Sequence, residues 1–590
     1  VDQISWADIN QPEYLHFQEL IQEGAVGLLN TATAGERNPD NNYLTVGSSS
    51  PSVGYPWAAT AKQGETGLYQ PNYQKLLEQK SHYKQDLGGL GEALRQAGLA
   101  VAVWGNADLS LDGLQPGRQA VTMFMDHQGR VAQGEVDFWQ EDASLPWGFR
   151  TDTQRLKQLF GEYYDDSQVL VIEFGDTTRE AYYGQDTKAL SRADQFLGWL
   201  MSQLNWQKDA LLCLAPTPNP RQLNNTFTPL LMRGAGIEPG LLTSDSTRRV
   251  GVISNLDLAP TILSFFNVPV PELMYGEPLQ SRAGQPISLT ELENNLVNSS
   301  LRKVPVLLAN GIYFGILLLL GGILAAAKVK NFTLPRYLEK FSYPLFFSVF
   351  LCPGAVLFLG FWPQLSGWAS ILLDLLLVAG LTALVYAVYR QVLVLESCLA
   401  GVALVFVGLV TLDLLFGSQL MLYSPLGYDL QRGARFYGLG NEYLGLLIGS
   451  EALGLSCFYS LQQTTRRMLG VLLVQLELLI LFALPTLGSN AGSSLTLTAV
   501  FISFFILWNR QKLALKKIVL TALALALLIA LLFGSDFWSS SHSHIGKALQ
   551  DIQLNGWWIA GQIITRKLLM NLALIKTNWL TLLVPSNSAR

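Results

Sequence analysis

The sequence changes character near residue 304, and this boundary constrains the fold more than any other feature. Polar and apolar side chains are mixed before it, whereas long apolar stretches follow it. The first of these, Val304 to Ala327, has no charged residue and is long enough to cross the ~30 Å hydrocarbon core of a bilayer. The chain therefore predicts a globular part joined to a part embedded in the lipid bilayer.

The membrane part is predicted to be an all-α transmembrane bundle of about eight helices, because helices satisfy their own backbone hydrogen bonds in hydrocarbon. Further candidate spans occur near residues 342–361, 369–388, 393–416, 440–460, 468–487, 493–509 and 518–534. We assign the bundle to residues 304–534 and the connection before it to residues 272–303. Residues 535–590 carry tryptophans beside cations, which predicts an outer interfacial amphipathic segment that is cut short at its C-terminus.

Basic residues fall in alternate connections between the candidate spans. These connections contain Lys328, Lys330, Arg336, Lys340, Arg390, Arg466, Arg467, Arg510, Lys512, Lys516 and Lys517. The positive-inside rule assigns such connections to the cytoplasm. The sequence thus predicts a multi-pass protein of the cell membrane with residues 1–303 on the extracytoplasmic side. Because an exported domain needs a signal or an anchor, we expect the native chain to begin upstream of Val1.

Charge and cysteine content exclude two classes of function. The formal net charge of −5 gives no basic surface of the kind that nucleic acid requires, so no nucleic-acid partner is expected. Only Cys213 lies in the globular part. One cysteine forms neither an internal disulfide nor a cysteine-based zinc site.

The globular part alternates short apolar runs with amphipathic stretches. The runs Ala25–Leu29, Ala100–Trp104, Ala120–Met125, Val169–Phe174 and Ala210–Ala215 are typical of buried strands, while residues 73–97 and 187–207 have helical periodicity. Strands that are apolar on both faces belong in a sheet covered on both sides. The pattern predicts an α/β sandwich with a central, mostly parallel sheet over residues 1–271, followed by a short helix at 288–300.

Three sequence segments of the globular part resemble segments of the alkaline phosphatase superfamily. Asp257-Leu-Ala-Pro-Thr-Ile-Leu263 with Phe266-Asn-Val-Pro269 is similar to a segment near the C-terminal end of that fold. Val1-Asp2 resembles the end of its first strand, and Gly24 to Ala34 followed by Tyr43 to Gly47 resembles its nucleophile region. The resemblance covers about residues 1–275.

The resemblance implies metal-assisted attack by a hydroxyl group on phosphorus or sulfur, with two metal ions clamping the attacking and leaving oxygens. Carried over by position, Thr31 or Thr33 would be the nucleophile. Asp2, Asp176 and Asp257 would be metal ligands.

The histidine ligands that the resemblance leads us to expect are missing. The chain has Pro216-Thr217-Pro218 where the family has Asp-His-Gly, and Ser254-Asn255 where a further histidine is expected. The histidines of this part, His16, His82 and His127, occupy no expected ligand position. The oxygen donors that remain suit one Mg²⁺, Mn²⁺ or Ca²⁺ ion better than two zinc ions.

Each candidate also has an ordinary structural interpretation. Thr31 and Thr33 can close a turn after a strand, and Asp257 can cap the helix that follows it. The carboxylate after the strand ending at Trp104, Asp108, lies either at a functional sheet edge or in a turn. Arg248-Arg249 is either an anion site or a solvated charge pair.

The membrane part contributes a second candidate site at the outer start of the fifth span. Arg432 and Arg435 precede Asn441 and Glu442, and two guanidinium groups beside a helix start can bind a phosphate or diphosphate. The segment is similar to arginine-bearing stretches of polymerases and ligases for lipid-linked sugars. The alternative is a loop whose arginines meet lipid headgroups. Acidic residues within the spans serve either proton or cation coupling or helix contacts: Asp374, Glu396, Asp413, Glu451 and Glu477.

These observations lead to one principal functional hypothesis and two alternatives. The principal hypothesis is a cell-envelope membrane protein whose outward-facing, catalytically degenerate domain acts on or recognises a phosphate-bearing lipid or glycopolymer. The first alternative is a metal-dependent phospho-group transferase or phosphodiesterase with a threonine nucleophile. The second is a transporter or assembly subunit.

Overall fold

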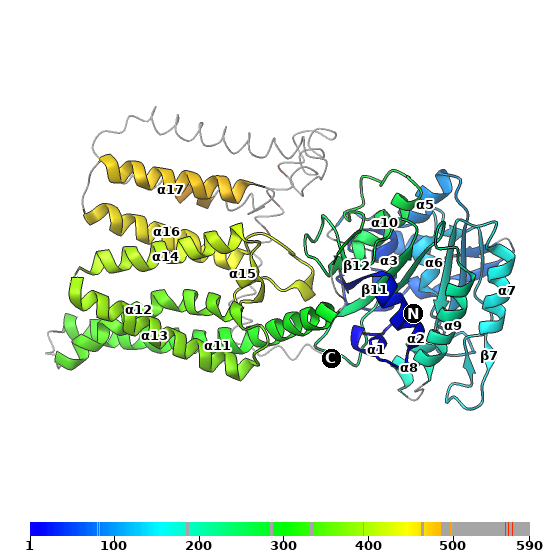
Figure 1. The fold of residues 1–590 in the computed structure, drawn as a ribbon, viewed down its shortest axis with the longest axis horizontal. Coiled ribbons are helices and arrows are strands. Elements are labelled where there is room, and N and C mark those ends of the chain that lie inside the picture. The colour runs from blue at the N-terminus through cyan, green and yellow to red at the C-terminus, as the bar shows by residue number, and fades with distance from the viewer. Residues whose placement is uncertain are drawn as a thin grey trace. The chain divides into compact units, whose positions relative to one another are not determined.

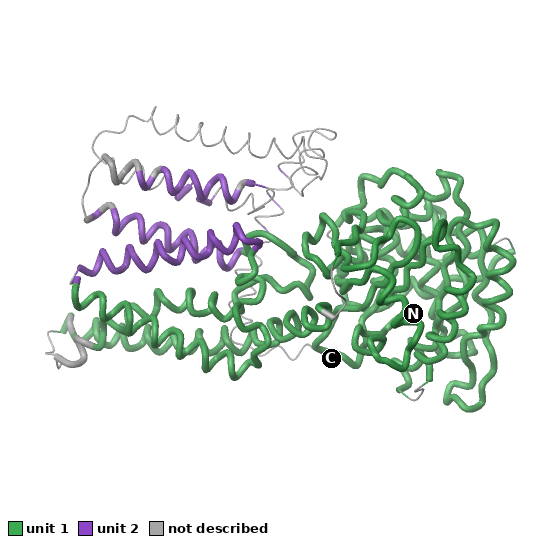
Figure 2. The backbone as a smooth tube through the Cα atoms, viewed as in Figure 1, with its two compact units in different colours: residues 1–391, 418–440 green, residues 392–417, 441–590 purple. Residues whose placement is uncertain are grey.

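The computed structural model describes residues 1–484, apart from 66, 80, 82, 185–187, 284–286, 331–335, 393 and 462–464, and a few isolated later positions. The chain divides into two compact units, shown in Figure 2. The first unit comprises Val1–Gln391 and Ser418–Gly440, and the second comprises Val392–Gly417 and Asn441–Arg590. The α/β part and the loop at 418–440 therefore belong to one unit.

A mixed six-stranded sheet is built around strand β1 (Ala25–Asn30). β1 pairs antiparallel with β11 (Phe227–Gly234) and parallel with β12 (Gly240–Thr243) and β13 (Val252–Ser254). β10 (Ala210–Leu214) extends the sheet beyond β11, and β14 (Gln280–Arg282) extends it beyond β12. The central strand thus brings together segments from both ends of the α/β part.

A second sheet is parallel and has the order β6-β4-β9. Its strands are β4 (Val101–Asn106), β6 (Gln133–Glu135) and β9 (Val169–Phe174). Smaller sheets are formed by β2 (Lys62–Gly64), β3 (Gly67–Tyr69) and β5 (Arg130–Val131), and by β7 (Gln140–Glu141) and β8 (Phe149–Arg150).

Helices surround these sheets (Figure 1). They are α1 (Trp6–Ile9), α2 (Leu15–Glu23), α3 (Pro39–Ser48), α4 (Tyr73–Leu77), α5 (Gly89–Gln96), α6 (Gln119–Phe124), α7 (Thr153–Tyr163), α8 (Asp176–Tyr183), α9 (Ala189–Gln203) and α10 (Leu258–Phe265), with the 3-10 turns η1 (Ala58–Thr60) and η2 (Asn255–Asp257). Side chains of β1 alternate between two hydrophobic cores: Val26 and Leu28 join one, and Ala25 and Leu29 join the other. The strand is buried on both faces, which explains its unbroken apolar sequence.

The predicted strands at 25–29, 100–104, 169–174 and 210–215 are confirmed as β1, β4, β9 and β10. The predicted strand at 120–125 is wrong, because this stretch forms helix α6. All six residues of α6 are buried, and it packs against α3 and β4. A short run that is apolar on every side has no periodicity to distinguish a helix from a strand. The predicted helix at 73–97 is two helices, and Gly88 at φ +88° begins the second.

Among the described residues, four helices are long and apolar enough to cross a membrane. They lie within α11 (Ile287–Val329), α12 (Arg336–Phe358) with its extension η3 (Leu359–Phe361), α13 (Gly367–Val392) and α14 (Leu395–Leu415). The predicted spans at 440–460 and 468–487 correspond to helices α16 (Asn441–Leu461) and α17 (Thr465–Ala483). The spans predicted at 493–509 and 518–534, and nearly all of the segment 535–590, lie outside the described residues.

Helix α11 continues without a break from the α/β part into the apolar region. The helix predicted at 288–300 is its first part, and the boundary predicted between 303 and 304 falls inside it. The buried Arg302 on α11 donates hydrogen bonds to the carbonyls of Trp362 (2.6 Å) and Leu359 (3.0 Å), and to that of Tyr423 at the end of α15 (Gln419–Tyr423). One guanidinium thereby satisfies carbonyls that helix ends leave unpaired.

Candidate functional site

The predicted site residues lie where strands of the two larger sheets end. Thr31 follows β1, Asp257 lies three residues after β13, and Asp176 lies two residues after β9. Asp2 lies beside the end of β10, where its carboxylate accepts a hydrogen bond from the backbone N–H of Thr217 at 2.6 Å. Strand ends of α/β sheets commonly carry functional side chains. The geometry around each residue decides what it can do here.

Neither candidate nucleophile is poised for attack. The hydroxyl of Thr31 is buried and donates to the carbonyl of Thr226 at 2.8 Å. The hydroxyl of Thr33 bonds to the carbonyls of Gly35 and Glu36 at 2.9 and 3.1 Å, inside an exposed turn. No hydrogen bond in the described part of the chain joins either hydroxyl to a side chain that could act as its base. Each threonine hydroxyl therefore stabilises the backbone segment whose carbonyl it contacts.

Asp257 is a fully buried hydrogen-bond acceptor. Its Oδ2 accepts from the hydroxyl of Ser244 at 2.7 Å and from the N–H of Ser254 at 3.0 Å, and its Oδ1 accepts from Ser246. Burial raises the pKa of Asp257, and these hydrogen bonds oppose the increase. The carboxylate ties the turn before α10 to the segment after β12, as an extended form of the cap that the sequence suggests.

Asp176 is bound by arginines. Its Oδ1 lies 3.0 Å from Nη1 of Arg179, and its Oδ2 lies 2.7 Å from Nε of Arg192. Oδ1 also accepts hydrogen bonds from the N–H and the hydroxyl of Thr151, at 2.7 and 2.9 Å. Both oxygens of this carboxylate therefore accept hydrogen bonds from protein donors.

Arg179 is the most deeply buried cation near these strand ends, with a side chain 1% exposed. Besides Asp176, it donates to the carbonyl of Asp108 at 2.8 Å, and to the carbonyl and side-chain oxygens of Asn106 at 3.1 and 2.8 Å. Burial lowers the pKa of Arg179, and the nearby carboxylates oppose this shift. A guanidinium thus gathers oxygen atoms at the ends of β4 and β9, a task that a metal ion performs in many hydrolases.

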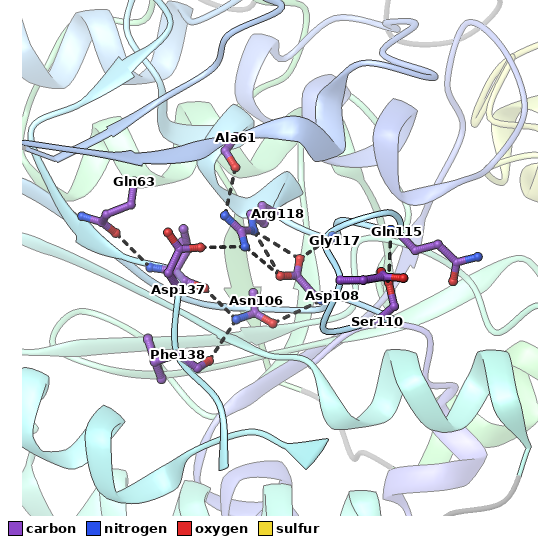
Figure 3. A network of polar contacts seen from close by, with 12 residues as sticks. Ala61, Gln63, Asn106, Asp108, Ser110, Gln115, Gly117, Arg118, Asp137 and Phe138 are labelled. Atoms are coloured by element: carbon purple, nitrogen blue, oxygen red, sulfur yellow. Dashed lines mark hydrogen bonds and ion pairs between the residues drawn. The ribbon is translucent and has the colours of Figure 1, made fainter. Parts of the chain in front are cut away.

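Asp108 belongs to a second network of polar contacts (Figure 3). Arg118 lies between two carboxylates, 2.9 Å from Asp108 and 2.7 Å from Asp137. The amide of Asn106 donates to the carbonyls of Val136 and Phe138 at 2.7 and 3.1 Å. The carboxylate that follows β4 is therefore part of an ion-pair network that holds two loops together.

The least satisfied polar group near the strand ends is Glu173 of β9. Burial and the neighbouring charge of Asp2 together raise its pKa to about 8, against the opposing effect of a hydrogen bond from Tyr43. The Oε2 atom of Glu173 and the hydroxyl of Thr217 are buried without hydrogen-bond partners in the described residues. Burial also raises the pKa of Asp2.

The three predicted metal ligands do not form a common site. Asp2, Asp176 and Asp257 each have separate partners, and no group of three or more His, Cys, Asp or Glu side chains in the described residues could hold a metal ion. The arrangement does not fit a two-zinc centre. The oxygen donors that do lie together are Asp2 and Glu173, with the hydroxyl groups of Tyr43 and Thr217 nearby.

A loop from between the membrane helices covers the end of β1. In this loop, residues 424–440, the carbonyls of Leu430 and Gln431 accept hydrogen bonds from the side-chain amide of Asn30 at 2.6 and 3.0 Å. The side-chain oxygen of Gln431 accepts from the N–H of Thr226 at 2.9 Å. The loop therefore binds directly beside the predicted nucleophile Thr31.

Three arginines of the α/β part also hold the 424–440 loop. Arg37 donates to the carbonyl of Gln431 at 2.5 Å, and Arg249 donates to the carbonyl of Phe436 at 2.9 Å and to the hydroxyl of Tyr428 at 2.6 Å. The guanidinium of Arg248 lies 4.2 Å from the ring centre of Tyr437. Arg248 and Arg249 are thus half-buried against the 424–440 loop.

The four residues of the predicted phosphate site fall into both units. Arg432 is exposed and lies 3.7 Å from Asp429, and Arg435 is half-buried in the same loop. Asn441 begins α16 and Glu442 lies in its first turn, in the second unit. The joint action of these four residues stays a prediction.

The sequence alone did not single out Asn30, Arg37, Glu173 or Arg179. Asn30 and Glu173 have the strongest signal, since each is a polar residue at the end of an apolar strand. Arg37 and Arg179 carry no such signal, because their partners lie far away along the chain.

No protein-family model and no curated protein matches this chain. Among solved structures, the chain is similar to the PH0037 protein from Pyrococcus horikoshii, with 12% sequence identity and a TM-score of 0.30. The match covers 45% of this chain and 94% of that protein.

We predict that replacing Arg179 destabilises the α/β part far more than replacing an exposed arginine. Arg179→Met leaves Asp176 and three further oxygen atoms short of a donor, and breaking a buried ion pair costs about 3–5 kcal/mol. Pulse proteolysis of the full chain in urea measures the loss. Arg95→Met, which removes an exposed partner of Glu92, is the matched control and is expected to leave the midpoint unchanged. Equal midpoints for the two variants would show that the Arg179 network does not stabilise the fold.

We predict that Glu173 makes stability fall as pH rises between about 4.5 and about 8. In this window the folded protein keeps a proton on Glu173 that the unfolded chain releases, so folding becomes less favourable by at most ~1.4 kcal/mol per pH unit. Glu173→Gln keeps the shape but cannot release a proton, so its stability is expected to vary less with pH. Urea midpoints measured across this range check the difference. Parallel pH profiles for the two proteins would contradict it.

Proposed function

We propose that this is a multi-pass protein of the cell envelope whose outward-facing α/β domain is a catalytically degenerate, alkaline-phosphatase-like domain that recognises a phosphate-bearing lipid or glycopolymer. The observation that carries the proposal is the set of hydrogen bonds made by the residues at the end of β1. The hydroxyl of Thr31 is buried against Thr226, and the 424–440 loop is hydrogen-bonded to Asn30 beside it. A nucleophile engaged by backbone and covered by a loop favours recognition over catalysis.

Replacement of metal ligands by other partners supports the same reading. Arg179 and Arg192 bind Asp176, and serines bind Asp257. Asn255 stands where a histidine is expected, and its amide donates to the carbonyl of Ala32 at 3.0 Å. These contacts hold the strand ends together without a metal ion. In this proposal the candidate catalytic residues stabilise the strand ends and take no part in a reaction.

The charge around the docked loop supports a phosphate-bearing ligand. Five arginines lie in or against the 424–440 loop: Arg37, Arg248, Arg249, Arg432 and Arg435. The Nε of Arg37 is buried without a hydrogen-bond partner in the described residues. Guanidinium groups bind phosphate oxygens in a bidentate manner. The loop joins the membrane helices, so a lipid headgroup at the outer leaflet is the ligand that fits this position best.

A metal-dependent phospho-group transferase or phosphodiesterase is the second candidate function. The specific observation in its favour is the unpartnered Oε2 of Glu173 beside Asp2, with the unpartnered hydroxyl of Thr217 nearby. Asp2 and Glu173 would hold one hard cation such as Mg²⁺, Mn²⁺ or Ca²⁺, which would polarise a phosphoryl oxygen. Thr31 would have to leave Thr226 before it could attack.

Activity measurements on the full chain distinguish the two functions. With phosphomonoester and phosphodiester substrates and added Mg²⁺, Mn²⁺ or Ca²⁺, we expect wild type, Thr31→Ala, Thr33→Ala and Asp2→Asn to show the same background rate. Metal-dependent turnover that disappears in Thr31→Ala would overturn the recognition proposal in favour of the transferase.

Recognition is measured separately in the same samples by calorimetric titration with glycerol phosphate as the headgroup probe. Arg435→Gln is expected to weaken binding about tenfold, in line with the loss of one charge-assisted hydrogen bond. Arg95→Gln removes a guanidinium far from the loop and is the control. Absence of binding to wild type would leave the proposal without its ligand and overturn it.

We predict that Gly433 is required for docking of the loop. It has φ +66°, and an added Cβ would lie 2.4 Å from Oδ1 of Asn30 and 2.5 Å from Cβ of Ala32. Gly433→Ala is expected to increase hydrogen exchange at the end of β1 roughly tenfold, because left-handed strain alone costs about 1–2 kcal/mol. Gly113 has φ +72° with open space around its Cβ position, so Gly113→Ala carries the strain without the clash. Unchanged exchange at β1 in Gly433→Ala would mean that the loop does not dock there.

A further inference from the structure

Three polar residues meet between helices α11, α12 and α13 within the apolar region. Asn310 of α11, Cys352 of α12 and Asp374 of α13 are 8%, 2% and 3% exposed. The helices lie side by side (Figure 1), and all three residues belong to the first unit. The function proposed for the α/β domain does not use this cluster.

The hydrogen bonds of the cluster are directional. Asn310 donates from Nδ2 to Oδ2 of Asp374 at 2.7 Å and to the carbonyl of Val306 at 3.0 Å. The thiol of Cys352 donates to Oδ1 of Asn310 at 2.5 Å. The other carboxyl oxygen of Asp374, Oδ1, is buried without a hydrogen-bond partner in the described residues. The carboxyl group of Asp374 therefore accepts a hydrogen bond at Oδ2, whereas its Oδ1 accepts none in the described residues.

The cluster lies inside the hydrocarbon-spanning part of the helices. Asp374 lies seven residues, about 10 Å, from the start of α13 at Gly367, and Asn310 lies six residues beyond Val304, where the predicted apolar stretch of α11 begins. Apolar side chains pack in one cluster with Cys352, including Tyr313, Phe314 and Val378.

Other charged and titratable groups face this region without neutralising Asp374. On α11, Arg302 donates to the hydroxyl of Ser370, one helical turn before Asp374 on α13, at 3.4 Å. The hydroxyl of Tyr313 donates to Ser348 of α12 at 2.6 Å. Within the described ranges, no Lys, Arg or His forms an ion pair with Asp374. The carboxyl group thus has no countercharge in contact.

We propose that Asp374 is a proton-binding site of the membrane part. An ionised carboxylate at this depth, with a single hydrogen-bond donor and no countercharge, is strongly disfavoured relative to water. Binding of one proton at Oδ1 neutralises the group and preserves the bond from Asn310 at Oδ2. Release of that proton places a negative charge between three helices, and their packing must then change to solvate it. The packing of the three helices therefore depends on whether Asp374 carries a proton.

Infrared difference spectroscopy of the full chain in lipid nanodiscs tests this proposal. As pH rises from mildly acidic to alkaline, the carbonyl stretch of a protonated carboxylic acid is expected to persist in wild type well above the pH at which exposed aspartates ionise. Asp374→Asn keeps the size of the side chain and should lose the part of this band that comes from Asp374, while the part from the protonated Glu173 remains up to about pH 8. Asp413→Asn, at another buried acid on α14, should retain it. Asn310→Leu removes the donor to the ionised form and should move the titration to more alkaline pH.

Labelling with dicyclohexylcarbodiimide, which reacts with protonated carboxyl groups in apolar surroundings, provides an independent measurement on the unmodified protein. Mass spectrometry of peptides should find the adduct at Asp374, in an amount that decreases as pH rises. The proposal is overturned if Asp374 is neither labelled nor visible as a protonated acid at mildly acidic pH. It is also overturned if added Na⁺ abolishes both signals at constant pH, because a metal cation would then be the occupant.

Discussion

The side-chain amide of Asn30 is the contact on which the organisation of the first unit depends. It ends the central strand β1, and it donates both of its hydrogens to backbone carbonyls of the loop at 424–440. Each of these hydrogen bonds is buried, so loss of either partner would leave unsatisfied polar groups, at a cost of about 1–3 kcal/mol per group. The sheet of the α/β part and the connection between membrane helices are therefore parts of one structure. The same contact lies directly beside Thr31, the predicted nucleophile.

Buried carboxyl groups at the strand ends are compensated by the protein itself. Asp176 is compensated by Arg179 and Arg192, whereas Glu173 is held neutral by burial beside Asp2. These are the two available solutions for a carboxyl group in a low dielectric, a countercharge or a proton. A planar guanidinium with five donors satisfies more oxygen atoms than one cation of simple shape, but it leaves no coordination position for a reacting group. The network therefore stabilises the ends of β4 and β9.

The sequence was sufficient for the features that depend on local pattern. Continuous apolar runs located β1, β9 and β10, and hydropathy located the membrane helices. The apolar pattern wrongly predicted a strand where α6 forms, because burial on all sides removes periodicity. It also predicted a boundary after residue 303 that falls inside α11, because a helix that crosses from water into lipid leaves no break in the chain. Of the candidate site, sequence reasoning found Thr31 and Asp257 but not their hydrogen-bond partners. Contacts such as Arg37 with Gln431 join residues 394 positions apart, and no local pattern encodes such a pairing.

Helix α11 provides a physical route between the α/β part and the buried acid in the membrane. Near its start, Thr290 accepts a hydrogen bond from the indole of Trp6, and Ser300 donates to Asp429 of the docked loop at 2.8 Å. Asn310, less than three turns further along, holds Asp374. Between Ser300 and Asn310, Pro305 lacks the N–H that would bond to the preceding turn, so the helix is continuous but has one backbone hydrogen bond fewer there. Under the proposal for Asp374, a change of its charge would act on the helix that also contacts the loop over β1, and undocking of that loop would act in turn on the surroundings of Asp374. Such reciprocity is a requirement of any thermodynamic coupling between two sites.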